Sequence, residues 1–339
     1  MRDTFTALRD DAQLAAYKVF GCEVALEPLP GGSGRPVLTG EVDGDHYVWV
    51  RRNSLRDAER ETRILSALDA SDATPRLLGA SGQWIIQQFV EGTRLPVVLE
   101  SARSNQDAEQ HVTSALNALQ HIHCIAAEAR LERIASPIGG TMSWLSARLG
   151  MINRSAVAVG CPTLQWREQH AARYVALPRT SFIKYDARPG NALWASGNAV
   201  WIDWEDCGVG LALEDLVFVL CDEWCSLDAA SEATLIDTFL PRFSGSLDEP
   251  DARFALRFYG TVHMASRIAV ILKAHEENDG FFDRGLALWS DKPGNTSREL
   301  LRIARRGRSW ASRLPGFDSA ASWFDQIGKF AVGKNACGR

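Results

Sequence analysis

The spacing of apolar residues changes near residue 91, and this change constrains the fold more than any other feature. From Cys22 onward, short apolar runs alternate with glycine-rich turns, in the order CEVALEPLP, GGSG, RPVLTGEV, DGD and HYVWVRR. This alternation is typical of an antiparallel meander, and PRLLGA and QWIIQQFV predict two further strands. Beyond about Arg94 the apolar residues recur at helical spacing. We therefore predict an α+β fold with two lobes: a small antiparallel-sheet lobe at residues 1–91 and a larger, mainly helical lobe at residues 92–339. A chain of 339 residues is long enough for two lobes that share a cleft.

Two helices are expected in the small lobe, at residues 4–20 and 55–68. Glu61 falls inside the apolar stripe of the second helix, together with Ala58 and Leu65. A carboxylate on that stripe faces inward, and a buried charge needs a partner. The sequence therefore predicts a cation close to Glu61.

One segment of the helical lobe differs from the rest, SFIKYDARPGNALWASGNAVWIDWEDCGVG. Its runs FIKYD and AVWID each end in aspartate and are separated by turn residues, which predicts a loop followed by a hairpin. Asp186 and Asn191 form a D-x-x-x-x-N pattern, and Asp203 follows Asn191 by twelve residues. Phosphoryl transfer uses a base that orients the acceptor hydroxyl and oxygen ligands for divalent ions. The three residues together supply this set, although each piece alone is as typical of an ordinary turn.

Composition narrows the function classes. The chain has 42 acidic and 37 basic residues and a formal net charge of -5, which argues against wholesale binding of nucleic acid. The basic run at residues 298–308 is interpreted as a solvated helix face. Seven cysteines without a CxxC pair indicate reduced thiols. The N-terminus lacks the apolar run of a signal peptide, and no uncharged stretch reaches membrane-spanning length. We expect a cytoplasmic protein with no membrane partner.

The segments KYDARPGNALW and VWIDWEDCGVG resemble the H-G-D-x-x-P-G-N-x-L and I-D-W-E motifs of the aminoglycoside phosphotransferase and choline kinase superfamily, whose fold is related to that of protein kinases. Upstream, GGSGRPV resembles the family's phosphate-covering loop, YVWVRR its basic strand, RETRIL its carboxylate-bearing helix and WIIQQFVEGTRL its hinge strand. The resemblance covers about residues 25 to 220 in the family's order.

The resemblance implies roles for individual residues. Asp186 matches the catalytic aspartate, and Asn191 and Asp203 match the ligands of magnesium. Arg51 matches the basic residue that contacts the ATP phosphates, and it would pair with Glu61. The remaining implied ATP contacts are Gly31, Gly32 and Gly34, which let the backbone approach the phosphates, and the hinge residues Gln88, Phe89 and Val90.

Two departures from the family pattern concern the catalytic loop. Lys184 and Tyr185 stand where the family has His-Gly, so the side chain that braces the loop is replaced. Arg188 stands two residues after Asp186, where relatives often carry histidine; as a catalytic residue it would reach the γ-phosphate, and as a structural residue it would be solvated. Asp215 resembles the family's aspartate that braces this loop.

The predicted activity is transfer of the ATP γ-phosphoryl group, with Mg²⁺, to a hydroxyl of a small amine-bearing molecule, an aminoglycoside-like antibiotic or an amino alcohol. Asp222, Glu223 and Trp224 are candidates for an acidic, aromatic wall around such a cation, although packing of an ordinary helix explains the same residues. The alternative is a nucleotide-binding pseudokinase with little turnover, which the Lys184-Tyr185 departure motivates.

Overall fold

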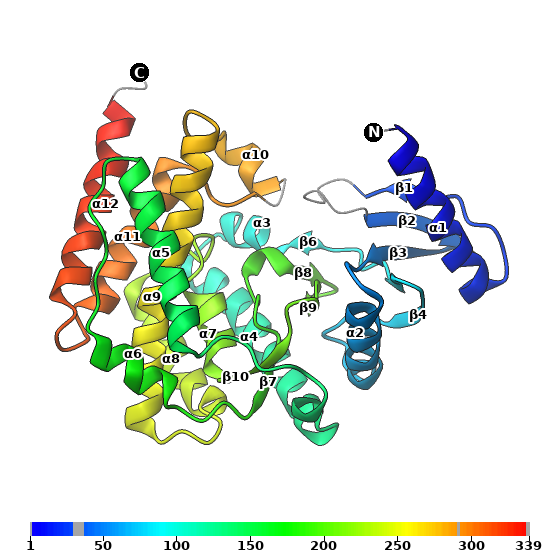
Figure 1. The fold of residues 1–339 in the computed structure, drawn as a ribbon, viewed down its shortest axis with the longest axis horizontal. Helices are drawn as coiled ribbons and strands as arrows, with labels where there is room; N and C mark the ends of the chain where they lie inside the picture. The colour runs from blue at the N-terminus through cyan, green and yellow to red at the C-terminus, as the bar shows by residue number, and fades with distance from the viewer. Residues whose placement is uncertain (1, 30–36, 290–291, 337–339) are drawn as a thin grey trace.

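The computed structural model describes residues 2–29, 37–289 and 292–336. Figure 1 shows a small sheet-containing lobe beside a larger helical lobe. The elements of the small lobe are α1 (Arg2–Phe20), β1 (Glu27–Pro28), β2 (Val37–Val42), β3 (Asp45–Arg51), α2 (Leu55–Leu68), β4 (Leu77–Ser81) and β5 (Trp84–Gln88). The strands form one sheet in the order β1-β2-β3-β5-β4, and every neighbouring pair is antiparallel.

The two faces of this sheet pack against different helices. On β3, Tyr47 and Trp49 face α1, and their rings lie 5.1 Å and 6.0 Å from the ring of Phe20. On β5, Ile85 packs into the cluster that contains Ala58 of α2. Side chains alternate along a strand, so each strand residue belongs either to the α1 face or to the α2 face. This division decides which arginine at the end of β3 points toward Glu61.

The helical lobe is built around long buried helices. Its helices are α3 (Leu95–Glu100), α4 (Asn105–Glu128), α5 (Met142–Ala158), α6 (Glu168–Val175), α7 (Leu213–Leu220), α8 (Ala229–Phe243), α9 (Glu249–Glu277), α10 (Arg284–Trp289), α11 (Ser297–Ala311) and α12 (Asp318–Ala336). Its strands are β6 (Thr93–Arg94), β7 (Ser181–Ile183), β8 (Ala192–Ala195), β9 (Asn198–Trp201) and β10 (Gly208–Gly210), and short 3-10 turns lie at Leu131–Arg133 and Pro189–Asn191. Strand β6 pairs with β8, β8 with β9, and β7 with β10, all antiparallel.

Side-chain caps begin many of these helices. The capping residue in each case accepts a hydrogen bond from a backbone N–H of the first turn, which satisfies a group that the helix itself leaves unpaired. These residues are Ser54, Ser104, Thr141, Asp228, Asp248 and Thr296. The predicted helix at residues 55–68 has the bounds of α2, and the one expected at residues 4–20 lies within α1.

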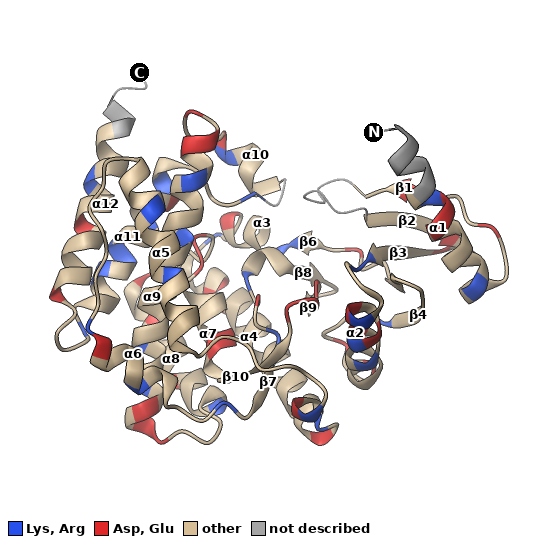
Figure 2. Ribbon diagram, viewed as in Figure 1, with Lys and Arg blue, Asp and Glu red and all other residues tan. Residues whose placement is uncertain are grey.

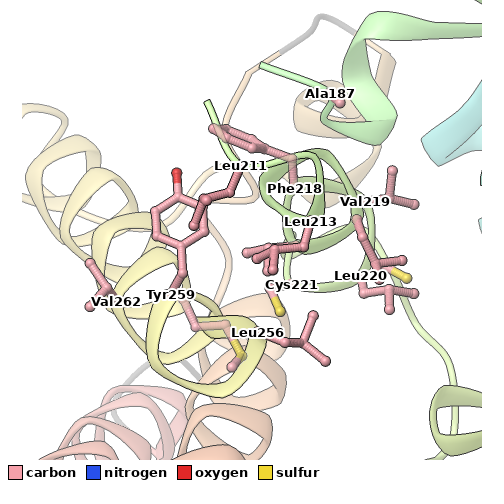
Figure 3. Packing of buried hydrophobic residues seen from close by; sticks show 14 of the residues in the cluster. Ala187, Leu211, Leu213, Phe218, Val219, Leu220, Cys221, Leu256, Tyr259 and Val262 are labelled. Atoms are coloured by element: carbon pink, nitrogen blue, oxygen red, sulfur yellow. The ribbon is translucent and has the colours of Figure 1, made fainter. Parts of the chain in front are cut away.

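Helix α7 forms the floor beneath the catalytic-loop segment. All eight of its residues are buried, and it packs against α9. Figure 3 shows Phe218 of α7 and Tyr259 of α9 in this core, with Ala187 of the loop nearby, and the two rings lie 6.3 Å apart. The loop therefore rests on a rigid support. Among the described residues, no helix is both long and apolar enough to cross a membrane.

Candidate active site

The D-x-x-x-x-N segment forms a closed loop between β7 and β8. The Asn191 side-chain amide donates to the Asp186 carboxylate at 2.7 Å and to the Asp186 main-chain oxygen at 2.9 Å. The backbone N–H of Ile202 donates to the Asn191 carbonyl at 2.9 Å, which brings the next residue, Asp203, to the same loop. Asp203 is 43% exposed and has a φ of 58°, a left-handed conformation that is uncommon for a residue with a side chain. The structure thus gathers Asp186, Asn191 and Asp203.

Asp186 is held in its ionised form. Its second carboxylate oxygen accepts a hydrogen bond from Arg188 Nε at 3.0 Å. Burial raises the pKa of Asp186, but the positive charges of Arg188 and Lys184 outweigh burial and leave this pKa below its ordinary value. A carboxylate in this state can accept a hydrogen bond from an incoming hydroxyl.

Lys184 braces the loop from beneath. Its side chain is 1% exposed, and its ammonium group donates to the main-chain oxygens of Asp203 at 2.8 Å and Asp186 at 3.4 Å. The ammonium also lies 5.3 Å and 5.9 Å from the ring centroids of Trp204 and Trp201. Burial lowers the pKa of Lys184, and the nearby Asp203 and Asp186 offset part of that effect. Lys184 therefore braces the loop at the position where the family has histidine.

Tyr185 and Asp215 complete this support. Tyr185 has a φ of 60°, so it takes a backbone conformation that glycine adopts without strain. The Asp215 carboxylate accepts hydrogen bonds from the backbone N–H groups of Lys184 at 2.8 Å and Tyr185 at 2.7 Å. The ring of His123 also lies 2.8 Å from Asp215. The expectation that Asp215 braces the loop is confirmed.

The cation that pairs with Glu61 is Arg52, and the expected pairing of Glu61 with Arg51 is wrong. Arg52 is 4% exposed and forms a two-pronged contact with the Glu61 carboxylate, at 2.5 Å and 2.6 Å. Arg51 instead donates to the Gln83 side chain at 2.6 Å. The reason is strand periodicity: Arg51 continues the α1 face of Tyr47 and Trp49, so the following residue points to the α2 face.

Arg52 also links the two lobes. Its guanidinium lies 3.7 Å from the Asp203 carboxylate and 3.3 Å from that of Glu205, and Arg60 of α2 donates to the Glu205 main-chain oxygen at 2.9 Å. Figure 2 shows basic and acidic positions alternating along α2. Burial lowers the pKa of Arg52, but its hydrogen bonds to Glu61 and the charges of Glu61 and Asp203 raise this pKa above its ordinary value. A fixed positive charge therefore faces Asp203 from the small lobe.

The remaining residues singled out from the sequence were expected to contact ATP. Gly31, Gly32 and Gly34 lie outside the described residues. The backbone N–H of Gln88 donates to Arg76 and that of Phe89 donates to His46, at 2.9 Å and 3.0 Å. Among the described residues no acceptor is bonded to the N–H of Val90, which leaves this group available to a ligand.

The expected acidic wall at Asp222, Glu223 and Trp224 is not an open surface. Asp222 and Glu223 are 0% and 1% exposed. Arg267 of α9 donates to both oxygens of the Glu223 carboxylate, at 2.7 Å and 2.5 Å. Burial and the adjacent Glu223 raise the pKa of Asp222 to about 7. Glu223 therefore neutralises an arginine of the protein, and both carboxylates are buried, so the expected cation wall is wrong.

Comparison with known proteins identifies the family. Residues 26–249 match the model of the phosphotransferase enzyme family. The chain belongs to this family. The expected resemblance is thereby confirmed, and the chain is a phosphotransferase. No curated protein matches the chain in sequence.

Solved structures show the same fold at low sequence identity. A protein from Ralstonia eutropha described as an aminoglycoside phosphotransferase is 13% identical, with a TM-score of 0.55 over 93% of this chain and 94% of that one. A choline/ethanolamine kinase family protein from Mesorhizobium loti is 17% identical, with a TM-score of 0.52 over 93% and 98%. A macrolide 2'-phosphotransferase from Brachybacterium faecium is 16% identical, with a TM-score of 0.50 over 79% and 93%. The predicted two-lobed, kinase-like α+β fold is confirmed.

Proposed function

We propose that this phosphotransferase moves the γ-phosphoryl group of ATP to a hydroxyl of a small molecule, with Asp186 as the catalytic base. The observation that carries the proposal is the position of the Asp186 carboxylate, which Asn191 and Arg188 hold by hydrogen bonds within a braced loop. The hydroxyl proton passes to Asp186 as the acceptor oxygen bonds to the γ-phosphorus, and the bond to the leaving ADP oxygen breaks. Arg188 would stabilise the charge of the transferring group.

The residues present fit a magnesium ion. The Asn191 amide nitrogen is used by Asp186, which leaves its side-chain oxygen for another partner, and the neighbouring Asp203 carboxylate is partly exposed. Mg²⁺ takes oxygen ligands and is commonly held by one or two carboxylates together with substrate phosphates. Asn191 and Asp203 would hold the ion, which neutralises charge on the phosphates when bound.

The nucleotide site rests on residues of the small lobe. Arg52, not Arg51, is positioned to reach the phosphates, because its guanidinium already faces Asp203. The free N–H of Val90 would bind the adenine edge, and the backbone at Gln88 and Phe89 would line the same hinge. The boundary between residues 1–91 and 92–339 is proposed to act as this hinge. Gly31, Gly32 and Gly34 retain their proposed role in covering the phosphates.

The experiment that tests this function is magnesium-dependent release of ADP from ATP with a panel of alcohols. The panel contains aminoglycosides, amino alcohols, sugars and hydroxy acids. We expect at least one alcohol to raise the rate of ADP release well above that with water alone, with a phosphorylated product visible by mass spectrometry. Tight ATP binding without a product from any alcohol would instead favour a pseudokinase.

A separate prediction concerns Lys184, the departure that motivates the pseudokinase alternative. Lys184→Met removes the donor that joins the Asp186 and Asp203 backbones, and an unsatisfied buried carbonyl costs roughly 1–3 kcal/mol. We expect kcat to fall by about tenfold or more, because each 1.4 kcal/mol corresponds to about a tenfold change. The matched control is Lys273→Met, which removes a lysine that is 66% exposed on α9. An unchanged kcat in Lys184→Met would show that the loop does not need this brace.

A further inference from the structure

We infer that the acceptor alcohol carries an anionic group, a carboxylate or a phosphate, and that Arg148 of α5 binds it. This inference rests on the proposed function and names the chemical class of its acceptor. It departs from the amine-bearing acceptor that the sequence suggested.

Arg148, on α5 of the helical lobe, contacts the residue that precedes Asp186. Its guanidinium donates to the phenol oxygen of Tyr185 at 3.3 Å, and Tyr185 directly precedes Asp186. The same guanidinium lies 5.1 Å from the ring centroid of Trp144, one turn earlier on α5. Arg52, which lies within 3.7 Å of Asp203, belongs instead to the small lobe. Arg148 is therefore held against Tyr185 of the catalytic loop by residues of the helical lobe.

The neighbouring arginines already have carboxylate partners. Arg267 is paired with Glu223, and Arg188 with Asp186. Arg148, in contrast, forms no ion pair with any carboxylate in residues 8–29, 37–289 and 292–333, where side chains are described. Its charge remains available to a ligand.

His263 shows that these charges share one region. The charges that act on its ring include those of Arg267, Arg148, Glu223 and Asp186. Burial, with the charges of Arg267 and Arg148, lowers the pKa of His263 to about 3, so the imidazole is neutral and adds no charge. The ring also packs 4.5 Å from Phe218, in the floor beneath the loop. Within this group Arg267 is offset by Glu223, and Asp186 by Arg188, so Arg148 is the member that no carboxylate of the described residues pairs with.

An oriented arginine with a free charge suits an anion. The planar guanidinium can donate two parallel hydrogen bonds to a carboxylate or phosphate, and Trp144 and Tyr185 restrict its motion before a ligand arrives. A cationic acceptor would be repelled by Arg148, and the carboxylates that could offset this, Asp222 and Glu223, are buried against Arg267. The competing explanation is that Arg148 only supports the Tyr185 ring.

The test compares alcohols that share a sugar skeleton and differ in charge. Glucuronate and glucose 6-phosphate supply the carboxylate and the phosphate, glucose is neutral, and glucosamine is cationic. We expect kcat/KM for an anionic member to exceed that for glucose and glucosamine by about tenfold or more. Calorimetric titration of the same four compounds, with magnesium and a non-hydrolysable ATP analogue present, measures binding separately from turnover.

Substitutions on α5 distinguish binding of the acceptor by Arg148 from support of the Tyr185 ring. Arg148→Gln should raise KM for the anionic acceptor by about tenfold or more and lower its advantage over glucose, and Arg148→Lys should retain part of that advantage. Arg154→Gln, which removes an exposed arginine of the same helix, is the control. An equal loss of kcat for all acceptors in Arg148→Gln would mean that Arg148 only supports the Tyr185 ring.

Two outcomes would overturn the inference while leaving the kinase reaction intact. One is a preference for glucosamine, and the other is turnover and binding that do not depend on the charge of the acceptor. Absence of ADP release with every alcohol would count against the proposed function itself, and binding of the anionic compounds would then still decide the inference.

Discussion

Asp186→Asn is expected to lower kcat by roughly 10²–10⁴-fold, the usual contribution of a general base. Asparagine has the same shape but cannot take up the proton of the acceptor hydroxyl at neutral pH. The loop should survive, because Lys184 and Asp215 brace it through backbone atoms that the substitution does not touch. The measurement is steady-state ADP release with the best acceptor of the panel.

Two controls make this result specific. Asp72→Asn removes an exposed carboxylate that lies outside the catalytic loop and should leave kcat unchanged. The affinity of Asp186→Asn for the magnesium complex of an ATP analogue, measured by calorimetry, should stay within a few-fold of the original. If the variant kept its kcat, Asp186 would not be the base. If it lost nucleotide affinity to the same degree as turnover, the loop would have collapsed and a second variant, Asp186→Glu, would be needed to separate charge from shape.

The sequence predicted the parts of the site that one continuous segment encodes. Asp186, Asn191 and Asp203 lie within a loop and hairpin whose strand and turn pattern is local, so their proximity follows from spacing. The bracing by Asp215 was also predicted, from the resemblance of this residue to the family's aspartate that braces the loop. The stripe of apolar residues in α2 likewise showed that Glu61 faces inward.

The predictions that were wrong concern contacts between segments that lie far apart in the sequence. The pairing of Glu61 depended on which of two adjacent arginines faces α2, and only the packing of β3 against α1 decides this. Lys184 was interpreted as a loss because its partners are two main-chain oxygens, one of them nineteen residues away, and a main-chain acceptor leaves no residue-type signal. The carboxylates Asp222 and Glu223 appeared exposed because their partner, Arg267, lies on α9, far along the sequence.

The finding that Arg52, and not Arg51, pairs with Glu61 leads to the second prediction. Arg52→Met should destabilise the protein by about 3–5 kcal/mol, because it leaves the Glu61 carboxylate buried without its partner. It should also weaken binding of ATP, since the positive charge beside Asp203 is lost. Arg51→Met is the matched control: this half-buried side chain donates to the neutral amide of Gln83, so we expect a change of about 1 kcal/mol or less. Urea unfolding measures the stability and calorimetry the nucleotide affinity.

A double variant separates the two roles of Arg52. In Arg52→Met combined with Glu61→Leu, both buried charges are replaced by apolar side chains, and such replacements are often neutral or stabilising. The free energy of unfolding should therefore recover most of its original value, whereas affinity for ATP should remain as low as in Arg52→Met alone. Recovery of both properties would mean that Arg52 serves only to neutralise Glu61. Equal losses in Arg51→Met and Arg52→Met would contradict the assignment, because Arg52 contacts Glu61 of α2 and Asp203, whereas Arg51 donates to Gln83.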